Sequence, residues 1–179
     1  MPALRRRGLG GGRLIVAVLS DLAALPQRRG PLALVALVLA ADQISKWWIV
    51  NQVMATPRVI EVTPFFNIVM VWNRGVTFGM LGMGGEAMRW LLVAVSLAIV
   101  GVLLVWLGRT SRRLSGLAIG AVIGGALGNV ADRVFLGKVA DFLDFHLLGW
   151  HWPAFNLADS AIVCGVALIV LDSFRDESN

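Results

Sequence analysis

The fold is decided by residues 114–135, LSGLAIGAVIGGALGNVADRVF, and by residues 155–174, FNLADSAIVCGVALIVLDSF. Each run is long and apolar enough to cross a bilayer, which takes about 20 helical residues. Each also contains a similar four-residue pattern, NVAD at 129–132 and NLAD at 156–159. An ionisable residue in a membrane span is energetically costly and indicates function. The two matching aspartates, Asp132 and Asp159, therefore predict a carboxylate pair.

The composition is that of an integral membrane protein. Hydrophobic residues make up 58% of the 179 residues and charged residues 15%, whereas soluble domains carry about 25% charged residues. The net charge of +5 comes from basic residues near the span ends, so nucleic-acid binding is not expected. Cys164, the single cysteine, is expected to pack in an apolar helix. His146 and His151 lack metal-ligand spacing, and neither a metal nor a cofactor is expected.

Four membrane spans are expected, over residues 32–50, 88–107, 114–135 and 155–174. Residues 1–31 are expected to form an irregular, arginine-rich cytoplasmic extension, residues 32–175 the membrane domain, and residues 176–179 a cytoplasmic tail. The apolar piece at 14–25 is too short to span a bilayer. An interfacial helix and a cleaved signal peptide are the alternatives for it. The small residues of the third span, Gly120, Gly124, Gly125 and Gly128, predict close helix packing.

Basic residues set the expected orientation. Six arginines precede the first span, and Arg109, Arg112 and Arg113 lie in the short connection between the second and third spans. The connections on the other side carry fewer basic residues in longer stretches. Because cytoplasmic connections are enriched in Lys and Arg, both termini of this multi-pass chain are expected in the cytoplasm.

The long outer connection predicts a small sheet. Residues 59–62 and 66–72 are rich in β-branched and aromatic side chains, which is typical of strands. They are too apolar for a freely solvated loop, so a sheet lying on the outer membrane surface is expected. Four tryptophans near the span ends fit an interfacial belt: Trp47, Trp48, Trp150 and Trp152. The expected fold class is an all-α membrane protein with a small extracytoplasmic sheet.

The predicted topology brings Asp132 and Asp159 to a similar depth, about 5 Å below the outer boundary at 1.5 Å of rise per residue. Asn129 and Asn156 precede them by three residues and share their helix faces. Two close carboxylates can hold one proton between them and activate a water molecule. The alternative is structural: each aspartate pairs with a cation such as Arg133, or caps a helix. Spacing alone leaves both interpretations open.

Five motifs occur in order along the four spans, namely DQISK at 42–46, NRGVTF at 73–78, GGALGNVADR at 124–133, VADF at 139–142 and FNLAD at 155–159. With these motifs, residues 32–175 resemble the lipoprotein signal peptidase family, also called signal peptidase II. Members are aspartic peptidases of the bacterial cytoplasmic (inner) membrane that cut the signal peptide just before a lipid-modified cysteine. The resemblance implies four spans, an outer β-cradle and a short, mobile outer helix.

The resemblance also implies roles for single residues. Asp132 and Asp159 would be the catalytic pair. Support of the pair or substrate binding is implied for Asn73, Gly75, Asn129, Arg133, Asp141, Asn156 and Ala158. The expected partners are lipid-modified prolipoproteins, membrane lipids and globomycin-type inhibitors, and a monomer is expected. Asp42 and Lys46 are four residues apart, so they are expected to pair on one helix face, either as a structural ion pair or with a direct chemical role.

Two other function classes compete with a peptidase. A transporter or proton channel can also hold paired aspartates, but such sites usually lie near the membrane midplane between internal repeats. Here the pair is expected near one edge, and the four spans show no internal repeat. A non-catalytic scaffold or lipid-binding protein would not need two matched carboxylates.

Overall fold

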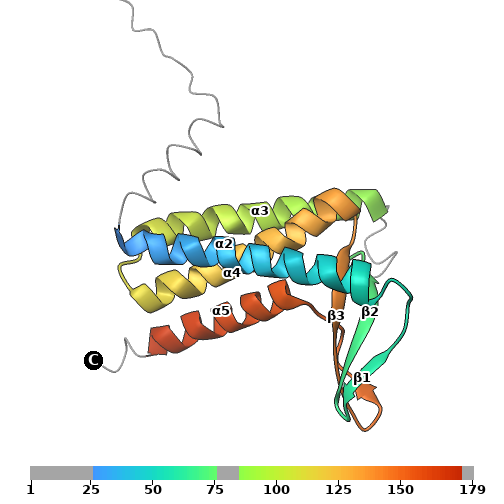
Figure 1. The fold of residues 1–179 in the computed structure, drawn as a ribbon. Helices are drawn as coiled ribbons and strands as arrows, with labels where there is room; N and C mark the ends of the chain where they lie inside the picture. The colour runs from blue at the N-terminus through green and yellow to red at the C-terminus, as the bar shows by residue number, and fades with distance from the viewer. Residues whose placement is uncertain (1–25, 76–84, 175–179) are drawn as a thin grey trace, which may run out of the picture.

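The computed structural model describes residues 26–75 and 85–174. Four helices there are long and apolar enough to cross a membrane, namely α2 (Pro26–Trp48), α3 (Gly85–Arg109), α4 (Arg113–Leu136) and α5 (Leu157–Phe174). The helices run alongside one another, and a sheet stands at one end of the bundle (Figure 1). The start of α2 and the end of α5 both lie at the opposite end (Figure 1). The predicted four spans with a small sheet are confirmed.

Helix α4 is the centre of the bundle. In its apolar window 67% of the residues are buried, against 17% in each of the other three helices. Its Ile119 and Ile123 form a buried cluster with Val100 and Leu107 of α3. The other helices turn large apolar side chains outward, as a lipid environment requires. Cys164 belongs to that outer surface: it is exposed on α5, so the expectation that it packs in the interior is wrong.

The first span begins earlier than the sequence predicted. Residues 26–31 were expected to be irregular, with the span starting at residue 32, but α2 already begins at Pro26. Proline suits the first turn of a helix, where its missing N–H has no intrahelical partner. Pro31 lies inside the helix and withdraws only one backbone donor there. The predicted extension at residues 1–25 and tail at 176–179 lie outside the described residues.

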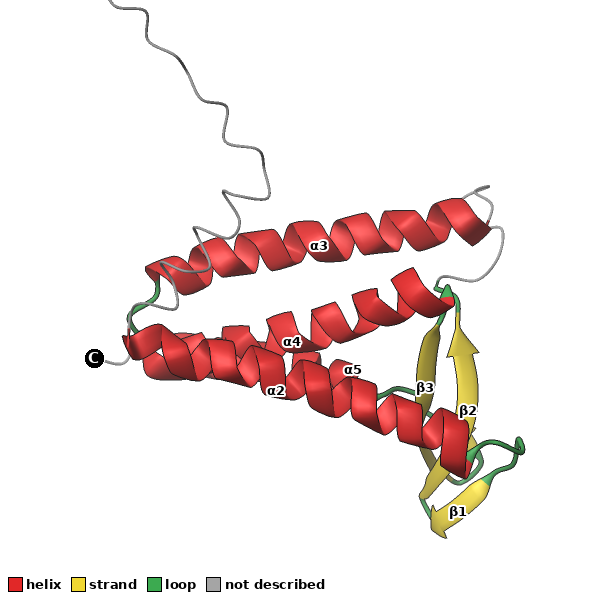
Figure 2. Ribbon diagram, turned by 45° about the horizontal axis from the view of Figure 1, so that its top comes forward, coloured by secondary structure: helices red, strands yellow, loops and turns green. Residues whose placement is uncertain are grey.

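The sheet is antiparallel, with strand order β1-β2-β3-β4 (Figure 2). Its strands are β1 (Ile60–Thr63), β2 (Phe66–Asn73), β3 (Val139–Leu147) and β4 (Trp150–His151). The first two match the predicted strands, whereas β3 and β4 were expected to be loop. Pairing of Val71 with Asp141 and of Asn73 with Val139 brings the end of β2 beside the start of β3, directly after α4.

Buried polar contacts stabilise the far part of the sheet. Asp144 of β3 is 6% exposed, and its Oδ2 accepts a hydrogen bond of 3.0 Å from Asn67 Nδ2. His151 Nδ1 lies 2.9 Å from Asp144 Oδ1. Burial raises the pKa of Asp144, but the hydrogen bonds from His151 and Asn67 outweigh burial and leave this pKa below its usual range. The rings of His146 and His151 stack 4.9 Å apart, so this pair joins β3 to β4.

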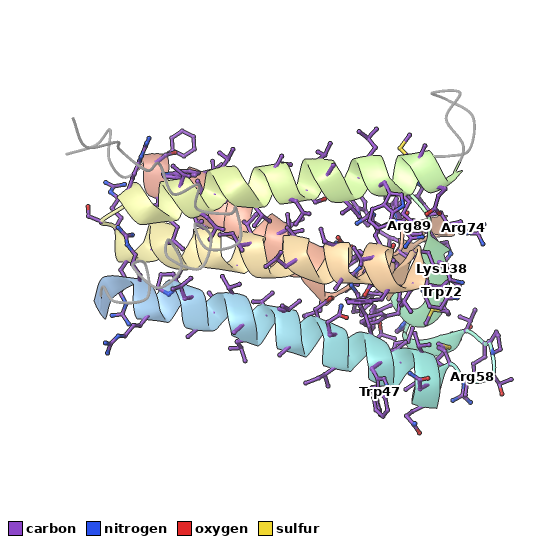
Figure 3. The ribbon with its side chains drawn as sticks, turned by 90° about the horizontal axis from the view of Figure 1, so that it is seen from above. Trp47, Arg58, Trp72, Arg74, Arg89 and Lys138 are labelled. Atoms are coloured by element: carbon purple, nitrogen blue, oxygen red, sulfur yellow. The ribbon has the colours of Figure 1, made fainter. Side chains whose placement is uncertain are left out.

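Other outer features are placed only in part. The predicted short outer helix has one candidate in the described ranges, the five-residue π-helix η1 (Ile49–Val53) that continues α2. Residues 76–84 of the outer connection lie outside the described residues. The four tryptophans of the predicted interfacial belt are exposed; Figure 3 shows Trp47 at the sheet end of the bundle.

We predict that Gly125→Ala destabilises the bundle and that Gly101→Ala does not. A Cβ at Gly125 would collide with the carbonyl oxygen of Ala158, so α4 and α5 would have to move apart. A Cβ at Gly101 would meet nothing within 4 Å, and Ala there should gain about 0.5–1 kcal/mol of helix propensity. Melting temperatures of the purified variants in detergent measure the difference, and equal melting temperatures would contradict the packing role of Gly125.

Candidate functional site

The predicted site residues gather where the helices meet the sheet. They come from the end of α2, the last turns of α4, the start of β3 and the start of α5. Figure 3 shows the surroundings of this end, with Arg89 and Lys138 near Trp72. Lys138 Nζ lies 4.0 Å from the centre of the Trp72 ring.

Lys46 is the centre of a buried charge network. Its Nζ lies 2.8 Å from Asp42 Oδ2 and 2.9 Å from Asp132 Oδ2, and donates to Asn129 Oδ1 at 3.1 Å. Lys46 is 4% exposed, Asp132 3% and Asp42 0%. The predicted pair of Asp42 and Lys46 is confirmed. The same ammonium also reaches Asp132 on α4, so one cation is shared by two buried carboxylates.

Asp132 is surrounded by donors. Besides Lys46, its Oδ1 accepts a hydrogen bond of 3.0 Å from Gln43 Nε2, and its Oδ2 accepts one of 3.3 Å from the backbone N–H of Ala140. A carboxylate in the last turn of a helix lies at the negative end of the helix dipole, which is unfavourable. The ammonium of Lys46 and the two N–H donors offset that penalty. The cation on Asp132 is therefore Lys46, and not Arg133 as the structural alternative suggested.

Asp159 and Asn156 form a reciprocal cap at the start of α5. The backbone N–H of Asp159 donates to Asn156 Oδ1 at 3.0 Å, and the backbone N–H of Asn156 donates to Asp159 Oδ2 at 3.3 Å. This arrangement is a capping box, built here with Asn and Asp. Asp159 Oδ1 accepts a further hydrogen bond of 2.7 Å from Asn129 Nδ2. The predicted capping role of Asp159 is confirmed, and its free oxygen faces α4.

Asn129 links the two aspartates. Its Nδ2 donates to Asp159, and its Oδ1 accepts from Lys46, which contacts Asp132. A chain of polar contacts therefore runs from Asp132 through Lys46 and Asn129 to Asp159. The four side chains come from three helices that are distant in sequence.

Asp42 and Ala158 connect α2 to the same cap. The backbone N–H of Ala158 donates to Asp42 Oδ1 at 2.9 Å. This approach is possible because Gly128 has no Cβ: one placed there would collide with Asp42 Oδ2. Ala158 is fully buried, and its carbonyl oxygen lies against Gly125. The glycines of α4 thus allow α2 and α5 to come close enough to share hydrogen bonds.

Asp141 closes the network from the sheet. Its Oδ1 accepts a hydrogen bond of 2.6 Å from Asn156 Nδ2, and Asn73 of β2 also donates to it. Burial raises the pKa of Asp141, and the charge of Asp159 raises it further, while the hydrogen bonds from Asn73 and Asn156 lower it; burial prevails. Asn73 itself is exposed, and its Oδ1 accepts from the backbone N–H of Gly75 at 2.8 Å. Gly75 has a φ of 95°, which favours glycine.

Two cavities open at this network. One of about 290 Å³ is lined by Lys46 and Asp132 together with Trp47, Trp72 and Phe135. The other, of about 420 Å³, is lined by Asn73, Gly75 and Asp141. An apolar chain and a polar backbone could enter from the membrane and from the sheet side, respectively. No group of three metal-ligating side chains occurs within residues 26–75 and 85–174.

Three contributors were absent from the predicted site. Gln43 bonds Asp132, although only its place next to Asp42 and three residues before Lys46 could have suggested it. The backbone of Ala140 was missed because β3 was expected to be loop. Arg89 of α3 donates to the carbonyl oxygens of Arg133 at 2.6 Å and Val134 at 2.9 Å, which caps the end of α4.

Arg133 has an incomplete set of partners. Its Nη1 donates to the carbonyl oxygen of Asn129 at 3.2 Å, whereas its Nε is buried without a hydrogen-bond partner among the described residues. The guanidinium therefore retains donors for another group at this end of the bundle.

Comparisons with known proteins agree with this architecture. The family model Peptidase_A8, signal peptidase (SPase) II, matches residues 34–175. A lipoprotein signal peptidase of Aeromonas hydrophila is 50% identical over 148 residues, covering 82% of this chain and 87% of the relative. One of Methylorubrum extorquens is 48% identical over 151 residues, covering 83% and 86%. A solved bacterial membrane enzyme at 31% identity has a TM-score of 0.70 and covers 82% of this chain and 93% of its own.

We predict that Lys46→Met destabilises the protein by about 3–5 kcal/mol, because Asp42 and Asp132 would stay buried without their cation. Lys138→Met is the matched control: Lys138 is only half-buried, and its contact with Trp72 is worth about 0.5–2 kcal/mol. Thermal melting of both variants in the same detergent compares them. A melting temperature for Lys46→Met no lower than that of the control would show that the ammonium does not hold the network.

Proposed function

This chain belongs to the signal peptidase II family, and on that premise we propose that it is an aspartic endopeptidase acting through Asp132 and Asp159. Its four apolar helices make it a multi-pass membrane protein, and membership of the family makes it a protease that processes lipoproteins. The proposed substrates are prolipoproteins with a diacylglyceryl-modified cysteine. The proposed cleavage removes the signal peptide just before that cysteine.

One observation carries the assignment of the pair. Asn129 bonds Asp159 directly and reaches Asp132 through Lys46, at the end of the bundle where the two cavities open. A purely structural role explains the cap at Asp159 and the ion pair at Asp132 separately. It does not explain why two structural carboxylates share one network beside cavities. The arrangement supports chemistry on a peptide held between sheet and bundle.

The proposed starting state has one proton on the pair. Asp132 contacts a cation and two further N–H donors, so we assign it the carboxylate form. Asp159 accepts only from neutral donors, Asn129 and the backbone of Asn156, and is partly exposed. We therefore assign the proton to Asp159, on the oxygen that turns toward substrate.

Hydrolysis then proceeds in two steps. Asp132 takes a proton from water as the water oxygen bonds to the scissile carbonyl carbon, and Asp159 gives its proton to the carbonyl oxygen. In the second step the carbon–nitrogen bond breaks. The leaving nitrogen, which belongs to the lipidated cysteine, takes the proton from Asp132. One hydroxyl of the former diol returns a proton to Asp159, and the pair is restored.

The neighbouring residues have proposed supporting roles. Asn73 is exposed beside the cavity that Asp141 also lines, so we assign it to contact with the substrate backbone. Asp141 fixes Asn156 by a hydrogen bond of 2.6 Å and thereby orients the cap that holds Asp159. Arg133, with its unpartnered Nε, is assigned to polar groups of the substrate.

The remaining expectations from the family enter as proposals. The enzyme is placed in the bacterial cytoplasmic membrane with both termini in the cytoplasm and the sheet outside, in keeping with the positive charge at the other end of the bundle. Inhibition by globomycin-type compounds and action as a monomer are proposed on the same ground.

We predict that Asp132→Asn and Asp159→Asn each lower turnover by about three orders of magnitude or more, and that the double variant is little worse than either. Asparagine keeps the shape of the side chain but removes its ionisation. The assay follows cleavage of a purified, lipidated prolipoprotein in detergent, together with the melting temperature of the same samples.

Asp144→Asn is the matched control, because Asp144 is a buried aspartate on β3 whose contacts lie in the sheet. It should melt earlier yet cleave at nearly the wild-type rate per folded molecule. A stable Asp132→Asn or Asp159→Asn variant with near wild-type turnover would rule out the aspartyl mechanism. Activity that fell only with the folded fraction would favour a structural role.

A further inference from the structure

A second polar cavity lies at the other end of the bundle, away from the sheet. It has a volume of about 320 Å³ and lies between the start of α2 and the turn from α3 to α4. Its lining includes Arg28, Arg112 and Arg113 together with Pro31, Gly116 and Leu117. The cavity therefore combines several guanidinium groups with an apolar wall.

Arg28 is a buried cation without a counter-charge. It is 6% exposed, and its Nη2 donates to the carbonyl oxygen of Gly108 at 3.2 Å. Its Nε is buried with no hydrogen-bond partner, and no carboxylate within residues 26–75 and 85–174 forms an ion pair with it. Arginine is almost never this buried unless it is paired. A buried, unpaired guanidinium beside a cavity indicates an anionic ligand.

The start of α4 lines the same cavity. This helix of 24 residues begins at Arg113, and no side chain caps its N-terminus. The first N–H groups of an uncapped helix carry a partial positive charge and bind phosphate readily. Helix end and Arg28 thus act in the same direction, although they come from different parts of the chain.

The acid described nearest to this cavity is already engaged. Asp172 of α5 accepts a short hydrogen bond from Ser115, and its Oδ2 lies 3.4 Å from Arg112 Nη1. This ion pair fixes Arg112 toward α5 and leaves Arg28 uncompensated. The apolar part of the lining, Pro31 and Leu117, would accept the first carbons of an acyl chain.

We propose that this cavity binds the phosphate of an anionic membrane phospholipid, with Arg28 and the N-terminus of α4 as its ligands. Basic pockets between membrane helices are suited to anionic lipid headgroups. The lipid is favoured over free phosphate because the cavity lies at the end of apolar spans and has an apolar wall. The inference does not depend on the peptidase mechanism.

The test uses the full chain, purified and delipidated in detergent. Dioctanoyl-phosphatidylglycerol should raise the melting temperature of the wild type in a saturable manner. Arg28→Gln should weaken its apparent affinity by about fivefold or more, the effect of losing one basic group near an anionic lipid. Arg29→Gln, which removes the same charge from the adjacent exposed residue, should bind like the wild type.

Other ligands and a second variant keep the result decisive. Dioctanoyl-phosphatidylcholine should stabilise less, and inorganic phosphate at millimolar concentration should stabilise little. Stabilisation by inorganic phosphate but not by the lipid would overturn the lipid assignment. Equal binding by wild type and Arg28→Gln, or equal losses in Arg28→Gln and Arg29→Gln, would overturn the site. If Arg28→Gln does not fold, Arg113→Gln replaces it with the same expected loss.

Discussion

The ammonium of Lys46 holds together the part of the molecule on which everything else depends. It lies 2.8 Å from Asp42 on its own helix and 2.9 Å from Asp132 on α4. No water is available in the hydrocarbon region to stabilise an unpaired charge. Each of the three charges is therefore tolerable only while the other two stay in place. This mutual requirement fixes the relative positions of α2 and α4 far more strictly than apolar packing could.

The sheet depends on that arrangement and completes it. Strand β3 follows α4 after a short turn, so the position of α4 determines where the strand begins. The backbone N–H of Ala140 then reaches Asp132, and Asp141 reaches Asn156. Both contacts are made by the first residues of the strand, whereas Asp144 and His151 stabilise its far part separately. The site is thus built from α4 and the near end of the sheet, while the far end is free to vary.

Sequence analysis reached the helices and the pair but not the connections between them. The length of the apolar runs predicted four spans, and the spacing of Asp42 and Lys46 predicted their ion pair. The contact between Lys46 and Asp132 joins residues 86 positions apart, and no local pattern encodes it. Strand β3 was missed because Asp141 and Asp144 interrupt its apolar character; both are buried, but each is satisfied by a partner from another element. A single sequence does not display such partners.

The cap of α5 explains how a structural aspartate can also take part in chemistry. Three side chains bind the first N–H groups of this helix: Asp42 accepts from Ala158, Asn156 from Asp159, and Asp159 from Asn156. Protonation of Asp159 would weaken only the last contact, whose length of 3.3 Å makes it the longest of the three. The other two do not involve the Asp159 carboxyl. The helix therefore keeps its N-terminus bound in both protonation states, and Asp159 can exchange a proton without releasing α5 from α2.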